Sequence, residues 1–228
     1  EHELPFIRET FNGIHAELEG AMPVLGFAGA PLTLLVFMVE GKSFGNDARA
    51  AIDFLKTRPN AANKLLDKLA DMTIEYLKYQ IRCGAAAVQL FESAAHLLTP
   101  ALYTEFALPH QQRVLEAVKG LAPTIMFARE WDRIEDVARS GADIVSLPSS
   151  LSIAEARDRI GRNRVVQGNL DNHLLARGTL AEIETATRAC IESGGCRGHI
   201  FNLSHGLLRD TPYENIEFMM NIVLEWGQ

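Results

Sequence analysis

His205 is the residue whose type and setting most suggest chemistry. It follows the apolar segment 198–203 (GHIFNL) and stands between Ser204 and Gly206. An imidazole changes charge near neutral pH, so it can give or take a proton or bind an anion. A loop histidine held only by hydrogen bonds fits the same pattern about equally well, and both interpretations stay open.

Ser93 and three basic residues are candidates for binding a carboxylate. Ser93 follows the apolar run 86–91 (AAVQLF), and its hydroxyl could bind a ligand. A serine in this position is more often a helix or turn cap. The charges of Lys42, Arg129 and Arg209 could also meet carboxylates, although each is more often a solvated surface charge.

Metal and nucleophile chemistry find little support in the sequence. The remaining histidines of interest lack metal-ligand spacing with Cys, Asp or Glu and are interpreted as structural or surface residues: His96, His110, His173 and His199. The cysteines form neither a paired framework nor a CxxC motif: Cys83, Cys190 and Cys196. This odd, sparse set is typical of a reducing cytoplasm. No Ser-His-Asp order or activated cysteine can be defended.

The elements that must position these residues follow from the hydrophobic pattern. Apolar runs predict strands at 23–29, 86–91, 124–128, 143–147, 164–169 and 198–203. Amphipathic segments predict helices at 6–19, 60–82, 99–120 and 132–141, and further helices beginning at Ser152, Thr179 and Thr211. Alternating strands and helices without hairpin signals predict a parallel sheet covered by helices, as either a barrel or an open doubly wound sheet. No glycine-rich nucleotide loop follows any strand, and no linker divides the chain.

Composition narrows the class of protein. The 228 residues are 47% hydrophobic and 22% charged, which is ordinary for a soluble globular domain. The net charge of −7 argues against nucleic acid as a partner. No apolar run approaches the roughly 20 residues of a membrane span, and the first residues do not read as a signal peptide. We therefore expect a cytoplasmic protein.

Five motifs occur in the order seen in one enzyme family. They are GFAGAPLTL (26–34), MVEG (38–41), GAAAVQLFES (84–93), QGNLD (167–171) and NLSHG (202–206). Together they make the chain resemble the uroporphyrinogen decarboxylases. The resemblance implies a (β/α)8 barrel whose first two strands are absent from this chain, so that residues 1–228 form a single, partial barrel domain. It also implies a homodimer and a lyase of haem biosynthesis that converts uroporphyrinogen to coproporphyrinogen without metal or organic cofactor.

The resemblance assigns roles to individual positions. His205 falls on the family's ligand-contacting or proton-handling histidine, and Ser93 on its donor to a substrate carboxylate. Gly29 and Ala30, in the first motif, fall at a substrate-binding strand end. Phe37 falls on the family's tyrosine before MVEG, so a hydroxyl near the reacting acetate is lost.

Further departures lie at other strand ends. The family's FAKG and LDWT read FARE (127–130) and LPSS (147–150), and Ser204 replaces a glycine beside His205. The segment after MVEG, GKSFGND (41–47), has fewer glycines than the family. Roughly the first hundred family residues, with their arginine motif and the aspartate that holds the pyrrole N–H groups, have no counterpart here.

Three explanations of this difference stay open. First, the chain is a fragment of a longer protein. Second, a partner or a symmetry mate supplies the missing strands. Third, the chain is a short paralogue whose sheet stays open. The functional alternatives to a lyase acting on an anionic tetrapyrrole are a non-catalytic tetrapyrrole-binding subunit and a zinc- or corrinoid-linked methyltransferase of the same superfamily. The latter needs His and Cys at strand ends, which the sequence does not place there.

Overall fold

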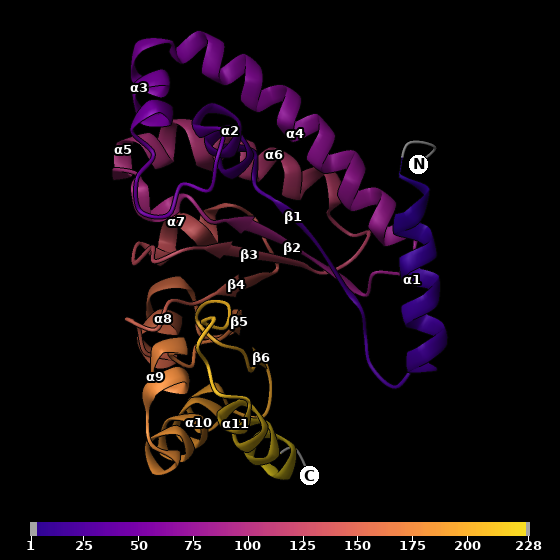
Figure 1. Cartoon of the computed structure of the whole chain (residues 1–228). Coiled ribbons are helices and arrows are strands. Elements are labelled where there is room, and N and C mark those ends of the chain that lie inside the picture. Colours follow the sequence, from indigo (N-terminus) through magenta and orange to yellow (C-terminus); the bar gives the residue numbers. More distant parts are fainter. Residues whose placement is uncertain (1–3, 227–228) are drawn as a thin grey trace. The chain divides into compact units, whose positions relative to one another are not determined.

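All six predicted strands are present in the computed structural model, which describes residues 4–226 (Figure 1). They are β1 (Leu25–Gly29), β2 (Ala87–Glu92), β3 (Thr124–Ala128), β4 (Ile144–Ser146), β5 (Val165–Gln167) and β6 (His199–Ile200). The chain divides into two compact units with three strands each. The first unit runs to Trp131 and includes Asp136–Asp143, and the second consists of Asp132–Glu135 and the chain from Ile144 onward.

The first unit is built on a parallel three-stranded sheet. β2 lies in the middle, with Gly29 of β1 opposite Phe91 and Ala128 of β3 opposite Glu92. Almost every residue of β2 and β3 is buried, as expected for parallel strands covered by helices. The parallel α/β prediction is confirmed for this unit.

The helices of the first unit are α1 (Pro5–Leu18), α2 (Pro31–Glu40), α3 (Arg49–Thr57), α4 (Pro59–Arg82), α5 (Pro100–Leu102) and α6 (Leu108–Val118), with a 3₁₀ turn η1 (Ala95–Leu97). Of these, α1 and α4 match their predicted ranges, whereas α2 and α3 were not predicted. The predicted single helix over 99–120 is wrong in its middle, where a π-helical turn, η2 (Tyr103–Ala107), separates α5 from α6. α7 (Ile134–Arg139) contains the boundary between the two units.

The sequence pattern failed to predict α2, the helix that follows β1. Its residues are apolar on nearly every side, so no amphipathic period marks it. Two local signals were present, because Pro31 occupies the first turn and Gly41 adopts a φ of 65° directly after the last residue. α2 matters for function because it begins at the carboxyl end of β1.

The second unit repeats the alternation on a smaller scale. β5 pairs in parallel with β4 and with β6, and the helices are α8 (Ile153–Ile160), α9 (Asn172–Arg177), α10 (Leu180–Gly194) and α11 (Tyr213–Trp226). The predicted capping box of Thr179 and Glu182 forms in full at α10. At α8 the Ser152 hydroxyl accepts the Glu155 N–H at 3.1 Å. Leu170, Leu175, Ile183 and Met219 form the apolar core of this unit. Within residues 4–226, no helix combines the length and the apolar character needed to span a bilayer.

Candidate functional site

The carboxyl ends of β1 and β2 bring together three of the predicted site residues. Gly29 lies opposite Phe91, and the Ala30 N–H donates to the Phe91 carbonyl at 2.8 Å. Ser93 follows two residues later and is half-buried. No other described residue forms a hydrogen bond with the Ser93 hydroxyl, so this hydroxyl can donate to a ligand.

A buried polar chain lies directly behind Ser93. The Thr33 hydroxyl donates to Glu92 Oε1 at 2.6 Å, and Gln111 Nε2 donates to Glu92 Oε2 at 3.1 Å. The Tyr103 hydroxyl in turn donates to Gln111 Oε1 at 3.0 Å. These four side chains come from α2, β2, α6 and η2, and none is more than 3% exposed. They tie the start of α2 to the end of β2.

Glu92 is the titratable member of this chain. Burial raises its pKa from 4.5 to about 7, against the opposing effect of the hydrogen bonds from Thr33 and Gln111. Burial also raises the pKa of Tyr103, whose ring stacks on Trp131 with 4.4 Å between centroids. Near neutral pH, Glu92 can therefore exist in either protonation state, whereas Tyr103 stays neutral.

Three phenylalanines form a row across the sheet of the first unit. Phe27 and Phe91 meet edge to face at 5.9 Å, and Phe91 and Phe127 lie 5.4 Å apart. Phe27 is 62% exposed, an unusual state for an aromatic side chain on a strand. Beside it lies a cavity of about 690 Å³, lined by Phe27, Gly29, Leu34, Thr73 and Tyr76 among others. Our sequence prediction missed this row, although a phenylalanine near the end of each of three neighbouring strands was a readable signal.

Phe37 lies away from the strand ends. It is seven residues beyond Ala30 on α2, which corresponds to roughly 10 Å along a helix axis. Its ring is 43% exposed and packs against Phe44, with 4.7 Å between centroids. The position thus offers a ligand an apolar surface without a hydroxyl.

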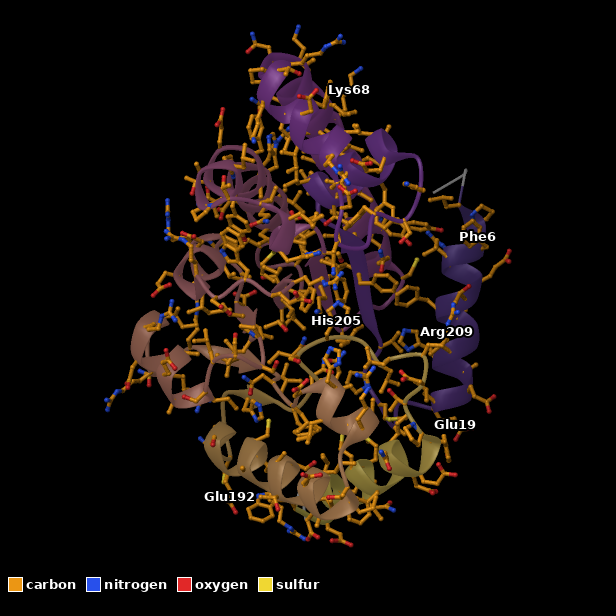
Figure 2. All side chains as sticks on the ribbon, turned by 60° about the vertical axis from the view of Figure 1, so that its left-hand side comes forward. Phe6, Glu19, Lys68, Glu192, His205 and Arg209 are labelled. Carbon is orange, nitrogen blue, oxygen red and sulfur yellow. The ribbon has the colours of Figure 1, made fainter. Side chains whose placement is uncertain are left out.

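In the second unit, His205 sits in a loop that is anchored on both sides (Figure 2). The Ser204 N–H before it donates to the Leu170 carbonyl at 2.8 Å. After it, the Gly206 carbonyl accepts from Asn172 Nδ2 at 2.9 Å. His205 itself is half-buried. The segment that follows β5 therefore fixes the backbone that carries the imidazole.

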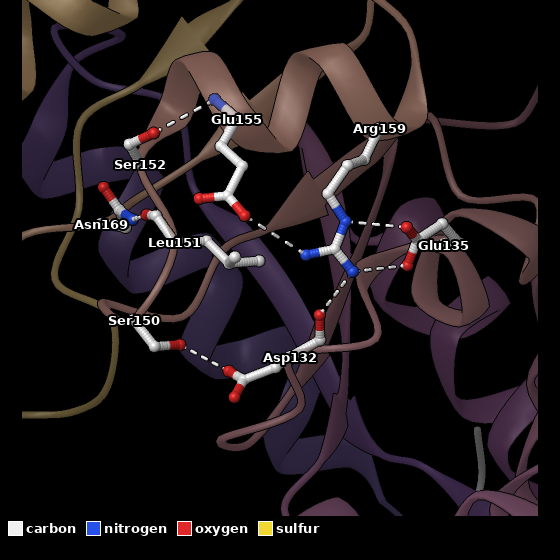
Figure 3. A network of polar contacts seen from close by, with 8 residues as sticks. All are labelled: Asp132, Glu135, Ser150, Leu151, Ser152, Glu155, Arg159 and Asn169. Atoms are coloured by element: carbon white, nitrogen blue, oxygen red, sulfur yellow. Dashed lines mark hydrogen bonds and ion pairs between the residues drawn. The ribbon is translucent and has the colours of Figure 1, made fainter.

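A second polar network holds the loop after β4, as Figure 3 shows. Arg159 of α8 contacts both carboxylate oxygens of Glu135, at 2.7 and 2.8 Å, and donates to the Asp132 carbonyl at 2.9 Å. Ser150, in the LPSS segment, donates to Asp132 at 2.5 Å. Asn169 donates to the Leu151 carbonyl at 2.6 Å. These contacts give the divergent LPSS segment a structural role.

The other polar candidates remain outside these sites. Arg129 pairs with the neighbouring Glu130 at 3.1 Å, and Lys42 and Arg209 are exposed. His96 Nε2 lies 3.1 Å from the Gly45 carbonyl, and burial lowers the pKa of this imidazole. Between Leu4 and Trp226, no group of three or more His, Cys, Asp or Glu side chains could hold a metal ion.

The sequence of this chain is similar to a known family of proteins. The profile of the family described as Uroporphyrinogen decarboxylase (URO-D) matches residues 1–226. A uroporphyrinogen decarboxylase of Trichodesmium erythraeum is 40% identical over 99% of this chain and 64% of its own length. The corresponding protein of Geobacter metallireducens is 36% identical over 100% of this chain and 67% of its own length. The chain thus spans about two thirds of the length of these relatives.

A solved structure supports the barrel type of fold. A methyltransferase from Methanosarcina mazei superposes with a TM-score of 0.84, covering 99% of this chain and 65% of that protein. The two sequences are 19% identical, so this similarity concerns the fold alone. It confirms the predicted α/β fold of a partial (β/α)8 barrel.

Proposed function

The chain belongs to the uroporphyrinogen decarboxylase family, and from this premise we propose that it forms part of the substrate site of a carboxy-lyase that removes acetate carboxyl groups from uroporphyrinogen. The observation that carries the proposal is the family match over residues 1–226. The residues at the strand ends supply groups suited to an apolar macrocycle with anionic substituents.

The aromatic row suits the tetrapyrrole itself. A pyrrole ring has two apolar faces. The exposed ring of Phe27 and its half-buried neighbour Phe91 offer an apolar surface for stacking, and the buried Phe127 packs against Phe91. The acetate groups carry negative charge. The Ser93 hydroxyl, at the end of β2, donates a hydrogen bond to one of them, and α2 begins at the end of the neighbouring strand β1.

Loss of the carboxyl group requires an electron sink and a proton. Protonation of a pyrrole α-carbon creates the sink, the C–C bond to the carboxylate breaks, and CO2 leaves. The electron pair of that bond neutralises the ring cation and leaves an exocyclic methylene group. A second proton converts this methylene to the methyl group, and the proton at the α-carbon is then lost, which restores the pyrrole ring. We assign His205 a role in handling one of these protons, because an imidazole can both give and take a proton and the loop of His205 is anchored on both sides.

Phe37 favours a second candidate, a tetrapyrrole-binding protein without decarboxylase activity. Its partly exposed ring provides no hydrogen-bond donor at the position where the family resemblance implies a tyrosine. A protein of this kind would retain Ser93, His205 and the aromatic row for binding, and it would release no CO2.

Anaerobic incubation of the purified chain with uroporphyrinogen III tests the proposal. We expect the chain to bind the substrate and to form no coproporphyrinogen alone, because it spans about two thirds of its relatives' length. Coproporphyrinogen formation would show that the chain carries the whole activity, and an absence of binding at micromolar concentrations would contradict the proposal.

Phe37→Tyr separates the two candidates in any preparation that shows turnover. A partial lyase site predicts faster decarboxylation after the hydroxyl is restored, and an unchanged rate contradicts a role for that hydroxyl. Met38→Tyr is the matched control, since it adds the same ring and hydroxyl at the neighbouring, 61% exposed position of α2.

A further inference from the structure

Thr33 touches the chain on both sides of Ser93. Its hydroxyl donates to the Glu92 carboxylate at 2.6 Å and accepts the Ala94 N–H at 3.3 Å. Ser93 lies between these two partners, and its hydroxyl forms no hydrogen bond with any residue in the described part of the chain. One buried hydroxyl on α2 thus contacts the residues on both sides of a serine whose own hydroxyl is available to a ligand.

The other side of Glu92 is fixed as well. Gln111 binds its second carboxylate oxygen, and Tyr103 binds Gln111. All of these side chains are buried, and the Tyr103 ring is stacked on Trp131. Because each oxygen of Glu92 has its own donor, rotation of the carboxylate would break a buried hydrogen bond.

We propose that Thr33 and Glu92 are positioning residues that hold the Ser93 hydroxyl in place to receive a carboxylate of the ligand. The Thr33 hydroxyl binds the Glu92 side chain before Ser93 and the Ala94 backbone N–H after it, and Glu92 orients the Thr33 hydroxyl. The identity of the ligand as an acetate-bearing tetrapyrrole rests on the proposed function above. The bracketing of Ser93 does not.

A network that only stabilises the fold would behave differently. Its loss would lower the free energy of unfolding without a local effect at Ser93 or any preference among ligands. A positioning network must loosen residues 93–94 and weaken the binding of those ligands that use Ser93.

Thr33→Val removes the hydroxyl at nearly constant volume, and Thr33→Ser retains it. Thr73→Val is the matched control, because Thr73 is also buried in a helix of the first unit and its hydroxyl has no hydrogen-bond partner. Amide hydrogen exchange of the full chain is measured for all three variants. We expect the Ala94 amide to exchange at least tenfold faster in Thr33→Val and at the wild-type rate in Thr33→Ser and Thr73→Val.

If Thr33→Val does not fold, Glu92→Asp replaces it in the exchange measurement, because the shorter side chain withdraws the carboxylate from the Thr33 hydroxyl. Faster exchange at Ala94 is again expected. Unchanged exchange in the folded variant overturns the inference, whether or not the chain binds a tetrapyrrole.

Porphyrin binding provides a second test of the positioning role. Uroporphyrin III carries acetate groups and coproporphyrin III does not, so we expect Ser93→Ala and Thr33→Val each to weaken uroporphyrin binding by roughly tenfold and to leave coproporphyrin binding unchanged. The double variant is expected to bind no more weakly than either single variant, because Thr33 acts through Ser93. If the affinity of the double variant fell by the product of the two single-variant losses, Thr33 would not act through Ser93. A wild-type chain that binds neither porphyrin would contradict the proposed function, and the exchange result would still decide the positioning role.

Discussion

The loops of Ser93 and His205 are held in place by different means. In the first unit, Ser93 is bracketed by one buried hydroxyl, and that hydroxyl is oriented by a buried carboxylate. In the second unit, the two residues beside His205 are bound by the segment after β5 through one backbone hydrogen bond, from Ser204 to Leu170, and one side-chain amide, that of Asn172.

Because the two loops are held by different groups, they should differ in how strongly pH and single substitutions loosen them. Backbone hydrogen bonds do not titrate, and most single substitutions leave them intact. The Ser93 loop depends instead on the protonation state of Glu92, whose pKa lies near 7. We therefore expect the first unit to respond to pH and to single buried substitutions more strongly than the second.

The largest effect is expected from Glu92→Gln. Because burial raises the pKa of Glu92 from 4.5 to about 7, the folded chain holds this proton more tightly than the unfolded chain. The contribution of Glu92 to stability is therefore greatest below pH 4.5, falls as pH rises to about 7 and is constant above. Relative to wild type, the variant should gain about 3 kcal/mol across this window.

Urea unfolding from pH 4.5 to 8 measures this change. Glu192→Gln, at an exposed position of α10, is the control and should follow the wild-type profile. Parallel profiles for Glu92→Gln and wild type would show that the buried carboxylate does not make the first unit pH-sensitive.

Tyr103→Phe should have the next largest effect. It leaves the buried Gln111 Oε1 without its donor, at a cost of about 2 kcal/mol. Chemical denaturation at pH 7 measures the loss. Tyr213→Phe, at a 71% exposed position of the second unit, should cost nothing measurable, and equal stability of both variants would contradict the buried network.

Asn172→Ala tests the side-chain contribution in the second unit. Loss of its bond to the Gly206 carbonyl should cost about 1 kcal/mol. Amide exchange near Ser204 should stay close to wild type, since the Ser204–Leu170 backbone bond remains. General loss of protection around His205 would mean that Asn172, and not the backbone, holds this loop.

The smallest effect is expected from Arg159→Ala in the network of Figure 3. Glu135 is about half exposed, so water screens the pair, and we expect a loss of about 0.5 kcal/mol that shrinks further in high salt. Thermal unfolding at two salt concentrations checks this. A loss of several kcal/mol would mean that side-chain contacts are as important in the second unit as in the first.

The sequence allowed the six strands and the parallel α/β class to be predicted because strand-length apolar runs alternate clearly with amphipathic helices. It also indicated Ser93 and His205 as candidates, and their roles stay predictions. Three helices were not predicted, α2, α3 and α9. α2 was missed because its uniform apolarity hides the helical period, and the π-helical turn was missed because nothing in its composition distinguishes it from α-helix.

The network behind Ser93 could not be read from the sequence. Thr33, Glu92, Gln111 and Tyr103 come from four separate elements, and only their packing brings them together. Glu92 was visible solely as part of the FES motif, where a glutamate at a strand end suggests exposure and not complete burial.

Equilibrium binding of uroporphyrin III at pH 7 tests the central claim most directly, using wild type, Ser93→Ala and His205→Ala with Glu192→Ala as the exposed control. If the Ser93 loop and the His205 loop each take part in binding an anionic tetrapyrrole, each loop variant should bind roughly tenfold more weakly than wild type, while the control binds normally. Unchanged affinity in both loop variants, or no binding by the wild-type chain, would contradict the account.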